Sequence, residues 1–504
     1  MRRALLLLLG IAAVTWLEFE IFPGHTYLQG ETQILLPILE RLDAPGYLSR
    51  DLVATHPNVT YTIYDEVTLF LHEGARLDFK TALAGQQVLF RAAGVTGVFL
   101  LALAAGVGDG FALLLAAVVN LGAALAGPAV LLTDPEPTPR AFAFGLVLLS
   151  MGLLAREKPL LAGLAGGLAL VYHVPTAAPF WGVVLLAFFC ERRLRKLLRP
   201  ALSILLVFAL LLANLAQLQP GVVEPQPLFA KISSRLAALQ RFRISYVWVS
   251  LWAGRQIWIY LAVWVLAVWA TTRLWPRLNL PLRWFLVALP FCGVLAVPLS
   301  DLLLEHLRWS LIPALQPART LVYTVALASF ACGVAGVQAL AKRRPREAAL
   351  WFAVVLLAPL SSVLQLRTRS ATMAAPAAQL ADWAQANTWG SSMFLFPDAG
   401  RELYPGMFRA ESLRSLWVDW ESGAQMKYFE SAGVEWWQRW RDVMQPGFSP
   451  QRLQAMLSLP IDYYVLKRAH QLANVQPVFA NRDLVVYDAS DLAKAASLRT
   501  VNGR

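Results

Sequence analysis

Long apolar runs separated by short polar stretches dominate the first 365 positions of this 504-residue chain. After Arg2 and Arg3, the run from Ala4 to Phe22 reaches spanning length without a small-residue cleavage site, which predicts an uncleaved first helix. About eleven transmembrane helices are expected in all. The further runs lie at 83–105, 111–133, 140–156, 159–173, 178–190, 200–218, 257–272, 284–300, 320–340 and 348–364.

Basic residues mark the short loops that should face the cytoplasm, because Lys and Arg collect on that side of a membrane. With Arg2 and Arg3 inside, the basic loops fall inside if residues 159–190 cross twice. Pro175, two residues after His173, supplies the break, since proline disfavours a continuing helix. The basic loops are at 156–158, 192–196, 273–283 and 342–344, and the outer segments are 24–82, 133–140, 219–256, 301–319 and the C-terminal region.

The pattern changes beyond about residue 365, where apolar runs shorten and tryptophans gather. Residues 377–386 predict a helix, and the short apolar runs at 393–396, 461–466 and 484–487 predict strands. We therefore expect a transmembrane domain over 1–365, with an outer loop at 24–82, and a small extracytoplasmic α/β domain over 366–504.

Composition agrees with an α-helical polytopic membrane protein. The chain is 57% hydrophobic and only 15% charged, whereas soluble domains carry about 25% charged residues. Its net charge of +12 does not indicate nucleic-acid binding, because most basic residues lie in the loops between spans. Cys190, Cys292 and Cys332 lie far apart, so neither a disulfide framework nor a zinc site is indicated. We expect a multi-pass protein of the inner membrane with a cytoplasmic N-terminus.

Acidic residues in two outer segments are the candidates for chemistry. Glu31 opens a helix-like stretch just beyond the first span, where a carboxylate can face a cavity at the lipid boundary. Asp134 and Glu136 lie in a loop with three prolines, which fix the backbone and so aim both side chains. The same loop could equally be a rigid connector with incidental charge.

Basic and polar residues on the outer side are the candidates for binding. Positive charge outside runs against the topology rule, so an anion such as a lipid phosphate or pyrophosphate is expected there, unless lipid headgroups alone are contacted. Arg241 and Arg255 precede the eighth span, and Arg319 follows Gln316 at a helix start, which suits a phosphate. His173 is either a buried hydrogen-bonding group or a cavity residue.

The layout resembles that of the GT-C glycosyltransferases. The shared features are an uncleaved first helix, a long outer loop that opens with Glu31, a second acid after the third span and a C-terminal outer domain. The resemblance implies a polyprenyl-phosphate sugar as donor, with Glu31 in the first acidic role and Asp134 or Glu136 in the second. Unlike many members, this chain has no Asp-x-Asp after its first helix, so no metal is assigned.

Three segments also look like a group of uncharacterised bacterial membrane proteins. They are Glu136–Arg140, Gln316–Arg319 and Phe408–Ser415, the last followed by Asp419 and Trp420. If the chain is a glycosyltransferase, the C-terminal domain with Arg409 and Arg414 is expected to bind the acceptor or to close over the site. The alternative is a non-enzymatic transporter or envelope assembly factor, although no internal repeat of the kind that many transporters have is present.

Overall fold

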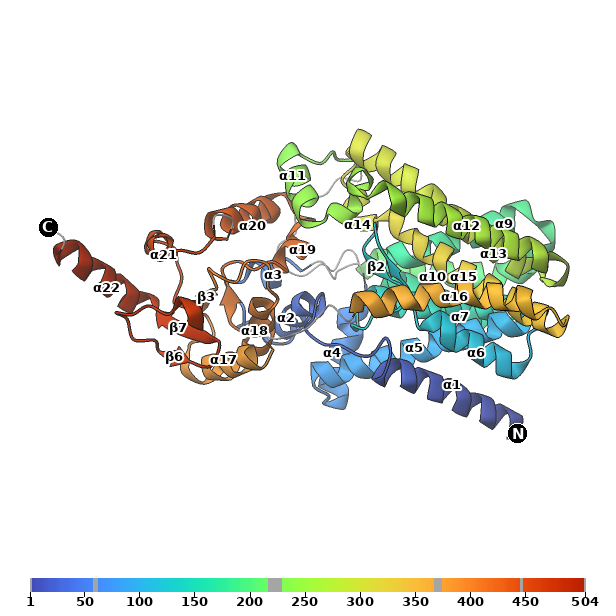
Figure 1. The fold of residues 1–504 in the computed structure, drawn as a ribbon, viewed down its shortest axis with the longest axis horizontal. Coiled ribbons are helices and arrows are strands. Elements are labelled where there is room, and N and C mark those ends of the chain that lie inside the picture. Colours follow the sequence, from blue (N-terminus) through green and yellow to red (C-terminus); the bar gives the residue numbers. More distant parts are fainter. Residues whose placement is uncertain (1, 58–61, 216–228, 367–373, 445–446, 503–504) are drawn as a thin grey trace.

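A computed structural model describes residues 2–57, 62–215, 229–366, 374–444 and 447–502. The molecule is elongated, with a bundle of long helices at one end and a small mixed domain at the other (Figure 1). The N-terminus lies at the far end of the bundle, and the C-terminus lies at the far end of the small domain. The chain therefore carries its apolar and its polar halves on separate ends of one long axis.

Within the described residues, each expected apolar run except 111–133 coincides with a helix, and positions 216–218 of one run lie outside those residues. Among the described residues, five segments are long and apolar enough to cross a membrane, and four shorter apolar helices accompany them. The protein is thus an integral membrane protein, while the number of crossings stays a prediction. The bundle helices are α1 (Arg2–Glu20), α5 (Phe79–Ala104), α6 (Asp109–Asn120), α7 (Pro139–Ala155), α8 (Pro159–Tyr172), α9 (Val174–Cys190), α10 (Arg195–Leu215), α12 (Gly254–Leu274), α13 (Leu280–Ser300), α15 (Leu321–Ala341) and α16 (Pro345–Leu366).

Close helix packing in the bundle depends on small residues, as is usual where lipid replaces water. A Cβ atom at Gly97 of α5 would lie 2.3 Å from the carbonyl carbon of Leu148 of α7. In the same interface, a Cβ atom at Gly145 would lie 2.2 Å from the carbonyl oxygen of Phe90. The two backbones therefore touch, and α7 is held firmly where its N-terminus enters the outer side.

The expected helix over 111–133 is wrong in its second half. Helix α6 ends at Asn120, and the chain continues as an antiparallel hairpin of β1 (Ala124–Leu125) and β2 (Val130–Leu131). Gly122 and Gly127 adopt φ of +83° and +85°, which a helix cannot contain. This hairpin brings apolar residues to the outer mouth of the bundle.

Segments from distant parts of the chain meet at the end of the bundle near the N-terminus. At the end near the N-terminus, Arg3 pairs with Asp109 at 2.7 Å, and the Asn279 amide donates to the Ala155 carbonyl at 2.7 Å. These contacts join loops that were all expected inside. The longer segments meet at the opposite end, next to the small domain. Which end faces the cytoplasm stays a prediction.

The small domain contains a five-stranded sheet in the order β4-β3-β5-β7-β6. Strand β3 is parallel to β4 and β5, whereas β7 is antiparallel to β5 and β6. The three predicted strands coincide with β3 (Met393–Leu395), β5 (Tyr463–Lys467) and β7 (Leu484–Asp488), and the two-residue edge strands β4 (Ser415–Leu416) and β6 (Phe479–Ala480) were not predicted. Its helices are α17 (Ala374–Asn387), α18 (Tyr404–Ser412), α19 (Ser422–Met426), α20 (Glu430–Val443), α21 (Pro450–Met456) and α22 (Ala489–Asn502).

The outer loop over 24–82 packs against this domain as well as against the bundle. It forms α2 (Thr32–Asp43), α3 (Leu52–Thr55) and α4 (Tyr64–Ala75), and α11 (Ser234–Arg243) comes from the loop before α12. One apolar core contains Ile38 and Val53 of the loop together with Trp436 and Leu466 of the C-terminal region. The outer loop is therefore fixed between the two halves of the molecule.

Candidate functional site

A cavity of about 180 Å³ lies where the outer segments meet the end of the bundle. Its polar walls come from five places in the chain: the start of α2, the loop before α7 with the first turn of that helix, the α8–α9 junction, the 3₁₀ turn Pro317–Thr320, and the end of α19. Glu31, Asp134, His173, Gln316 and Arg319, all singled out from the sequence, line it together. Their roles stay a prediction.

One wall of the cavity is acidic and is organised by Arg140. This residue is the second residue of α7, directly after Pro139, so the helix start aims its side chain. One guanidinium nitrogen donates to Oε1 of Glu31, and the other donates to Oδ2 of Asp134 at 2.5 Å. Two carboxylates from separate segments are thereby brought to one point.

Glu31 remains open to the cavity, with 40% of its side chain exposed. Burial alone would raise its pKa, but the positive charges of Arg140, Arg319 and Lys427 lower the pKa of Glu31 to about 2. Glu31 is therefore a carboxylate at any physiological pH. Such a group can accept a hydrogen bond from a hydroxyl in the cavity.

Asp134 is held by its own rigid loop. Its Oδ1 accepts from the backbone N–H of Glu136 at 3.2 Å, and its Oδ2 accepts from the hydroxyl of Thr138 at 3.3 Å. Its carbonyl oxygen accepts from the guanidinium of Arg91 at 3.1 Å. The expected stiffness of the proline-rich loop thus results from hydrogen bonds as well as from proline.

Glu136 is not among the residues that line the cavity, and its expected catalytic role stays a prediction. Its carboxylate accepts from the backbone N–H groups of Gln29 at 2.7 Å and of Thr32 at 3.2 Å, and from the Thr32 hydroxyl at 2.9 Å. Burial raises the pKa of Glu136 to about 7, with a smaller contribution from the charge of Asp134. This side chain joins the two outer loops to each other.

Two further cations, Arg319 and Lys427, line the same cavity, and we call them its cationic wall. The guanidinium of Arg319 lies 5.2 Å from the ring centre of Tyr246, and the Lys427 ammonium lies 3.3 Å from the Tyr246 hydroxyl and 4.7 Å from the ring centre of Tyr428. Within the described ranges, neither cation forms an ion pair with a carboxylate. Burial would lower the pKa of Lys427, but the two phenols raise it, so the side chain stays charged.

Sequence reasoning missed Lys427 because it lies in the C-terminal domain without a surrounding motif. It is the residue after α19, and it is buried. Arg140 was noted only as part of a short motif, although Pro139 before it marked a helix start. The sequence feature that could have predicted this ion pair is a basic residue at a helix start together with an acid in the preceding loop.

His173 and Gln316 complete the polar lining. His173 caps α9, since its Nδ1 accepts from the backbone N–H of Thr176 at 3.2 Å. A ring nitrogen that accepts a hydrogen bond carries no proton, so this contact holds the imidazole in its neutral form. Gln316 adopts φ of +45° and its amide donates to the Tyr428 hydroxyl at 3.2 Å.

Two predicted phosphate ligands, Arg241 and Arg255, are not among the residues that line the cavity, and their role stays a prediction. The guanidinium of Arg241 stacks 4.4 Å from the ring centre of Trp248 and lies 3.9 Å from Glu305. Arg255 is exposed near the start of α12. The basic loop before α12 therefore serves its own packing and the outer surface.

Arg409 and Arg414 are also not among the residues that line the cavity, and the expectation that their domain binds the acceptor or closes over the site stays a prediction. Arg414 is bonded to the end of α17, where its guanidinium donates to the Thr388 carbonyl at 3.0 Å. Arg409 is fully buried and donates to Asp419 at 2.9 Å. Neither guanidinium is available to a ligand.

No group of three or more His, Cys, Asp or Glu side chains among the described residues is placed to hold a metal ion. The cation between Glu31 and Asp134 is instead the guanidinium of Arg140. The acidic wall thus contains its own counter-charge.

Comparison with known proteins gives only structural likenesses, since no family model and no curated protein matches. ArnT from Cupriavidus metallidurans is similar in its apo state (13% identity, 96% of this chain and 97% of that chain, TM-score 0.43) and bound to undecaprenyl phosphate (14%, 96% and 98%, 0.41). The arabinofuranosyltransferase AftD from Mycobacteria is similar over 97% of this chain, which spans 40% of AftD (15% identity, TM-score 0.49). At such low scores, the function has to be argued from the cavity itself.

Proposed function

We propose that this protein is a membrane glycosyltransferase that moves a sugar from a polyprenyl-phosphate donor to an acceptor hydroxyl on the extracytoplasmic side. The observation that supports this most is that one cavity is lined both by carboxylates and by cations that have no carboxylate partner among the described residues. Glu31 and Asp134 form an acidic wall, while Arg319 and Lys427 are cations without a carboxylate partner among the described residues. A hydroxyl nucleophile and a phosphate leaving group need opposite environments of this kind.

The charge of the cavity supports a donor with a single phosphate. Glu31 and Asp134 contribute two negative charges, and Arg140, Arg319 and Lys427 contribute three positive charges, which leaves one positive charge. His173, whose Nδ1 accepts a hydrogen bond and so carries no proton, does not change this sum. A sugar phosphodiester carries one negative charge, and charge-assisted hydrogen bonds from guanidinium and ammonium groups would hold it.

The transfer would be a single displacement at the anomeric carbon. The acceptor oxygen forms the new glycosidic bond while the bond from the anomeric carbon to the phosphate oxygen breaks, and the phosphate leaves toward Arg319 and Lys427. The hydroxyl proton passes to a carboxylate, for which Glu31 is the candidate. A carboxylate with a pKa of about 2 is a weak base, so the proton moves late, after bond formation has made the acceptor oxygen acidic.

The remaining lining of the cavity supports a lipid-linked donor. Val130, Leu131 and Leu132 from the hairpin, together with Val322 of α15, give the cavity an apolar side next to its charged walls. An isoprenyl chain that continues from the phosphate would bury apolar surface there or in the adjoining membrane. We place the site at the outer face of the inner membrane, with the N-terminus in the cytoplasm.

Turnover of a panel of polyprenyl-phosphate pentoses and hexoses by purified protein in nanodiscs tests the proposal. We expect transfer by the wild type, its loss in Glu31→Gln and weaker donor binding in Arg319→Ala. Arg255→Ala is the matched control, because it removes an exposed outer guanidinium away from the cavity. Donor binding that none of the cavity substitutions weakens would overturn the proposal and favour a transporter or assembly factor.

A further inference from the structure

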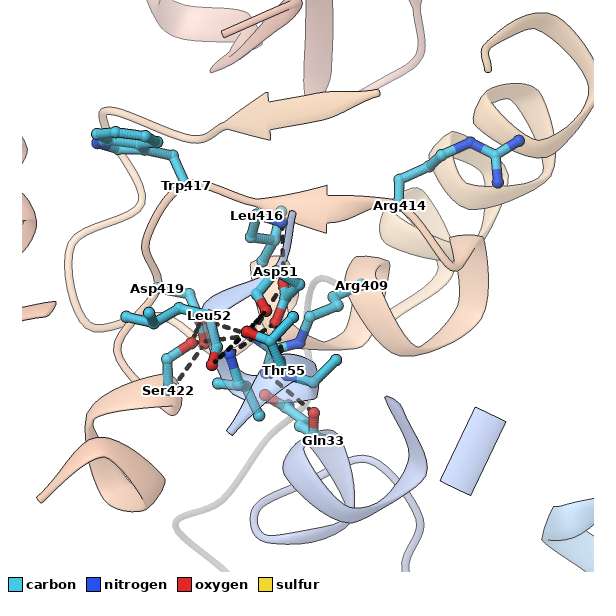
Figure 2. A network of polar contacts seen from close by, with 12 residues as sticks. Gln33, Asp51, Leu52, Thr55, Arg409, Arg414, Leu416, Trp417, Asp419 and Ser422 are labelled. Atoms are coloured by element: carbon cyan, nitrogen blue, oxygen red, sulfur yellow. Dashed lines mark hydrogen bonds and ion pairs between the residues drawn. The ribbon is translucent and has the colours of Figure 1, made fainter. Parts of the chain in front are cut away.

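A second cluster of charged residues lies between the outer loop and the C-terminal domain, and Arg409 of α18 is its centre (Figure 2). One nitrogen of Arg409 donates to Asp419 at 2.9 Å and to the Ser422 hydroxyl at 2.8 Å. The other nitrogen donates to the backbone carbonyl of Gln33 at 3.0 Å. Arg409 thus bonds to two segments that lie almost four hundred residues apart in the chain.

Asp51 extends the same cluster to the edge of the sheet. Its Oδ2 lies 3.9 Å from Arg409 and accepts from the backbone N–H of Leu416, in edge strand β4, at 3.0 Å. Its Oδ1 caps α3 by accepting from the backbone N–H of Val53 at 3.0 Å. The loop that contains Asp51 is therefore docked onto the sheet by hydrogen bonds as well as by apolar packing.

Both segments that Arg409 joins lead directly into the cavity. Gln33 lies in the first turn of α2, two residues after Glu31 of the acidic wall. Ser422 is the first residue of α19, and Lys427 of the cationic wall follows the last residue of this five-residue helix. The distance between the two walls therefore depends on how α2 and α19 are held relative to each other.

We propose that Arg409 is a positioning residue that sets the separation between Glu31 and Lys427. This inference rests on the proposed function of the cavity. Only a planar fork of donors satisfies Asp419, Ser422 and the Gln33 carbonyl at once, and a lysine ammonium does not reproduce this geometry. A shift of about 1 Å in a site that positions two substrates costs about 10²-fold in rate.

Arg409→Lys tests the inference, with Arg414→Lys as a matched control. Both substitutions shorten a buried guanidinium of the C-terminal domain, but only Arg409 contacts α2 and α19, and Arg414 points away from the cluster (Figure 2). We expect kcat/KM to fall about 10²-fold in Arg409→Lys at a temperature where both variants are folded. Arg414→Lys should keep the rate of the wild type. An equal loss in both variants would overturn the inference.

A covalent tether gives a rescue test. A Cβ atom at Gly406 of α18 would lie 3.4 Å from Cβ of Gln33, close to the separation of about 3.8 Å in a disulfide. In Arg409→Lys, the pair Gln33→Cys and Gly406→Cys should restore the rate when oxidised and lose it again on reduction. A background with Cys190→Ala and Cys292→Ala limits mispairing. A tether that forms without restoring the rate would contradict the inference.

Hydrogen exchange separates this inference from the proposed function, because it needs no turnover. We expect Arg409→Lys to raise amide exchange in both segments, 31–35 and 422–427, whereas Arg414→Lys leaves both segments unchanged. If the wild type transfers no sugar but exchange rises in this pattern, the proposed function fails while the positioning role holds. Unchanged exchange in either segment of Arg409→Lys would overturn the positioning role.

Discussion

Two arginines in this protein each hold a pair of carboxylates, but they do so in opposite surroundings. Arg140 joins Glu31 and Asp134 at the cavity, where 40% of the Glu31 side chain is exposed. Arg409 lies near Asp419 and Asp51, and no side chain of that group is more than 2% exposed. The same ion-pair chemistry thus forms a candidate reaction site where one carboxylate is open, and a fixed connection where all members are enclosed.

The largest expected effect comes from removing the open carboxylate. Glu31→Gln should lower the transfer rate about 10³-fold, since a positioned proton acceptor contributes about 10² to 10⁴. The melting temperature in nanodiscs should change little, because Arg140 keeps Asp134 as a partner. A variant that loses its fold together with its activity would make Glu31 a structural residue like Asp419.

Removing a carboxylate from the buried cluster around Arg409 should lower the stability of the protein instead. Asp419→Asn leaves Arg409 buried without its closest counter-charge, and breaking a buried pair in this way costs about 3 kcal/mol. Thermal unfolding followed by tryptophan fluorescence measures the loss. Wild-type stability in Asp419→Asn would show that the hydrogen bonds to Ser422 and Gln33 suffice for Arg409.

Removing one of the two cations that lack a carboxylate partner should have a smaller effect, and this effect should be on donor binding alone. Arg319→Ala and Lys427→Ala should each weaken donor binding about 10- to 30-fold, because a hydrogen bond to a charged group contributes about 1.5 to 2 kcal/mol. The acceptor KM should not change. Titration with a short-chain polyprenyl phosphate measures the affinity, and an unchanged affinity in both variants would show that the phosphate binds elsewhere.

The smallest effect concerns pH. The pKa of Glu31 is lowered to about 2 in the folded protein, so its contribution to stability is complete above its unfolded pKa of about 4.3 and is lost only as the pH falls toward 2. The acid side of the pH–rate profile should therefore show no decline from Glu31 between pH of about 7 and about 5. Arg140→Lys weakens the contact of this side chain with Glu31 and Asp134. The pH below which the transfer rate declines should therefore be higher in this variant. An unchanged profile in that variant would contradict the role given to Arg140.

The sequence predicts much of this architecture because hydropathy and charge act locally. Apolar runs located the bundle helices, and basic loops predicted which loops meet at each end. The hairpin at 124–131 was missed because its residues are as apolar as a helix, and only Gly122, Gly127 and Pro128 distinguish it. Hydropathy averaged along the chain hides such turn residues, although they mark the point where a helix ends.

The candidate site was partly predictable for a different reason. Arg319 stood out because positive charge on the outer side runs against membrane topology. Glu31 stood out by its place just beyond the first span, and Asp134 by its proline-rich loop. Lys427 and Arg409 lie in a polar domain where charge is ordinary, and their environments result from long-range packing that sequence alone does not reveal. Arg409 was therefore expected to bind a substrate, although the structure encloses it.

The most direct test of the account is sugar transfer from a polyprenyl-phosphate donor panel by the wild type, Glu31→Gln and the double variant Arg319→Ala with Lys427→Ala. The account predicts turnover by the wild type, donor binding without turnover in Glu31→Gln, and neither binding nor turnover in the double variant. Equal donor binding by the wild type and the double variant would contradict the assignment of this cavity as the donor site.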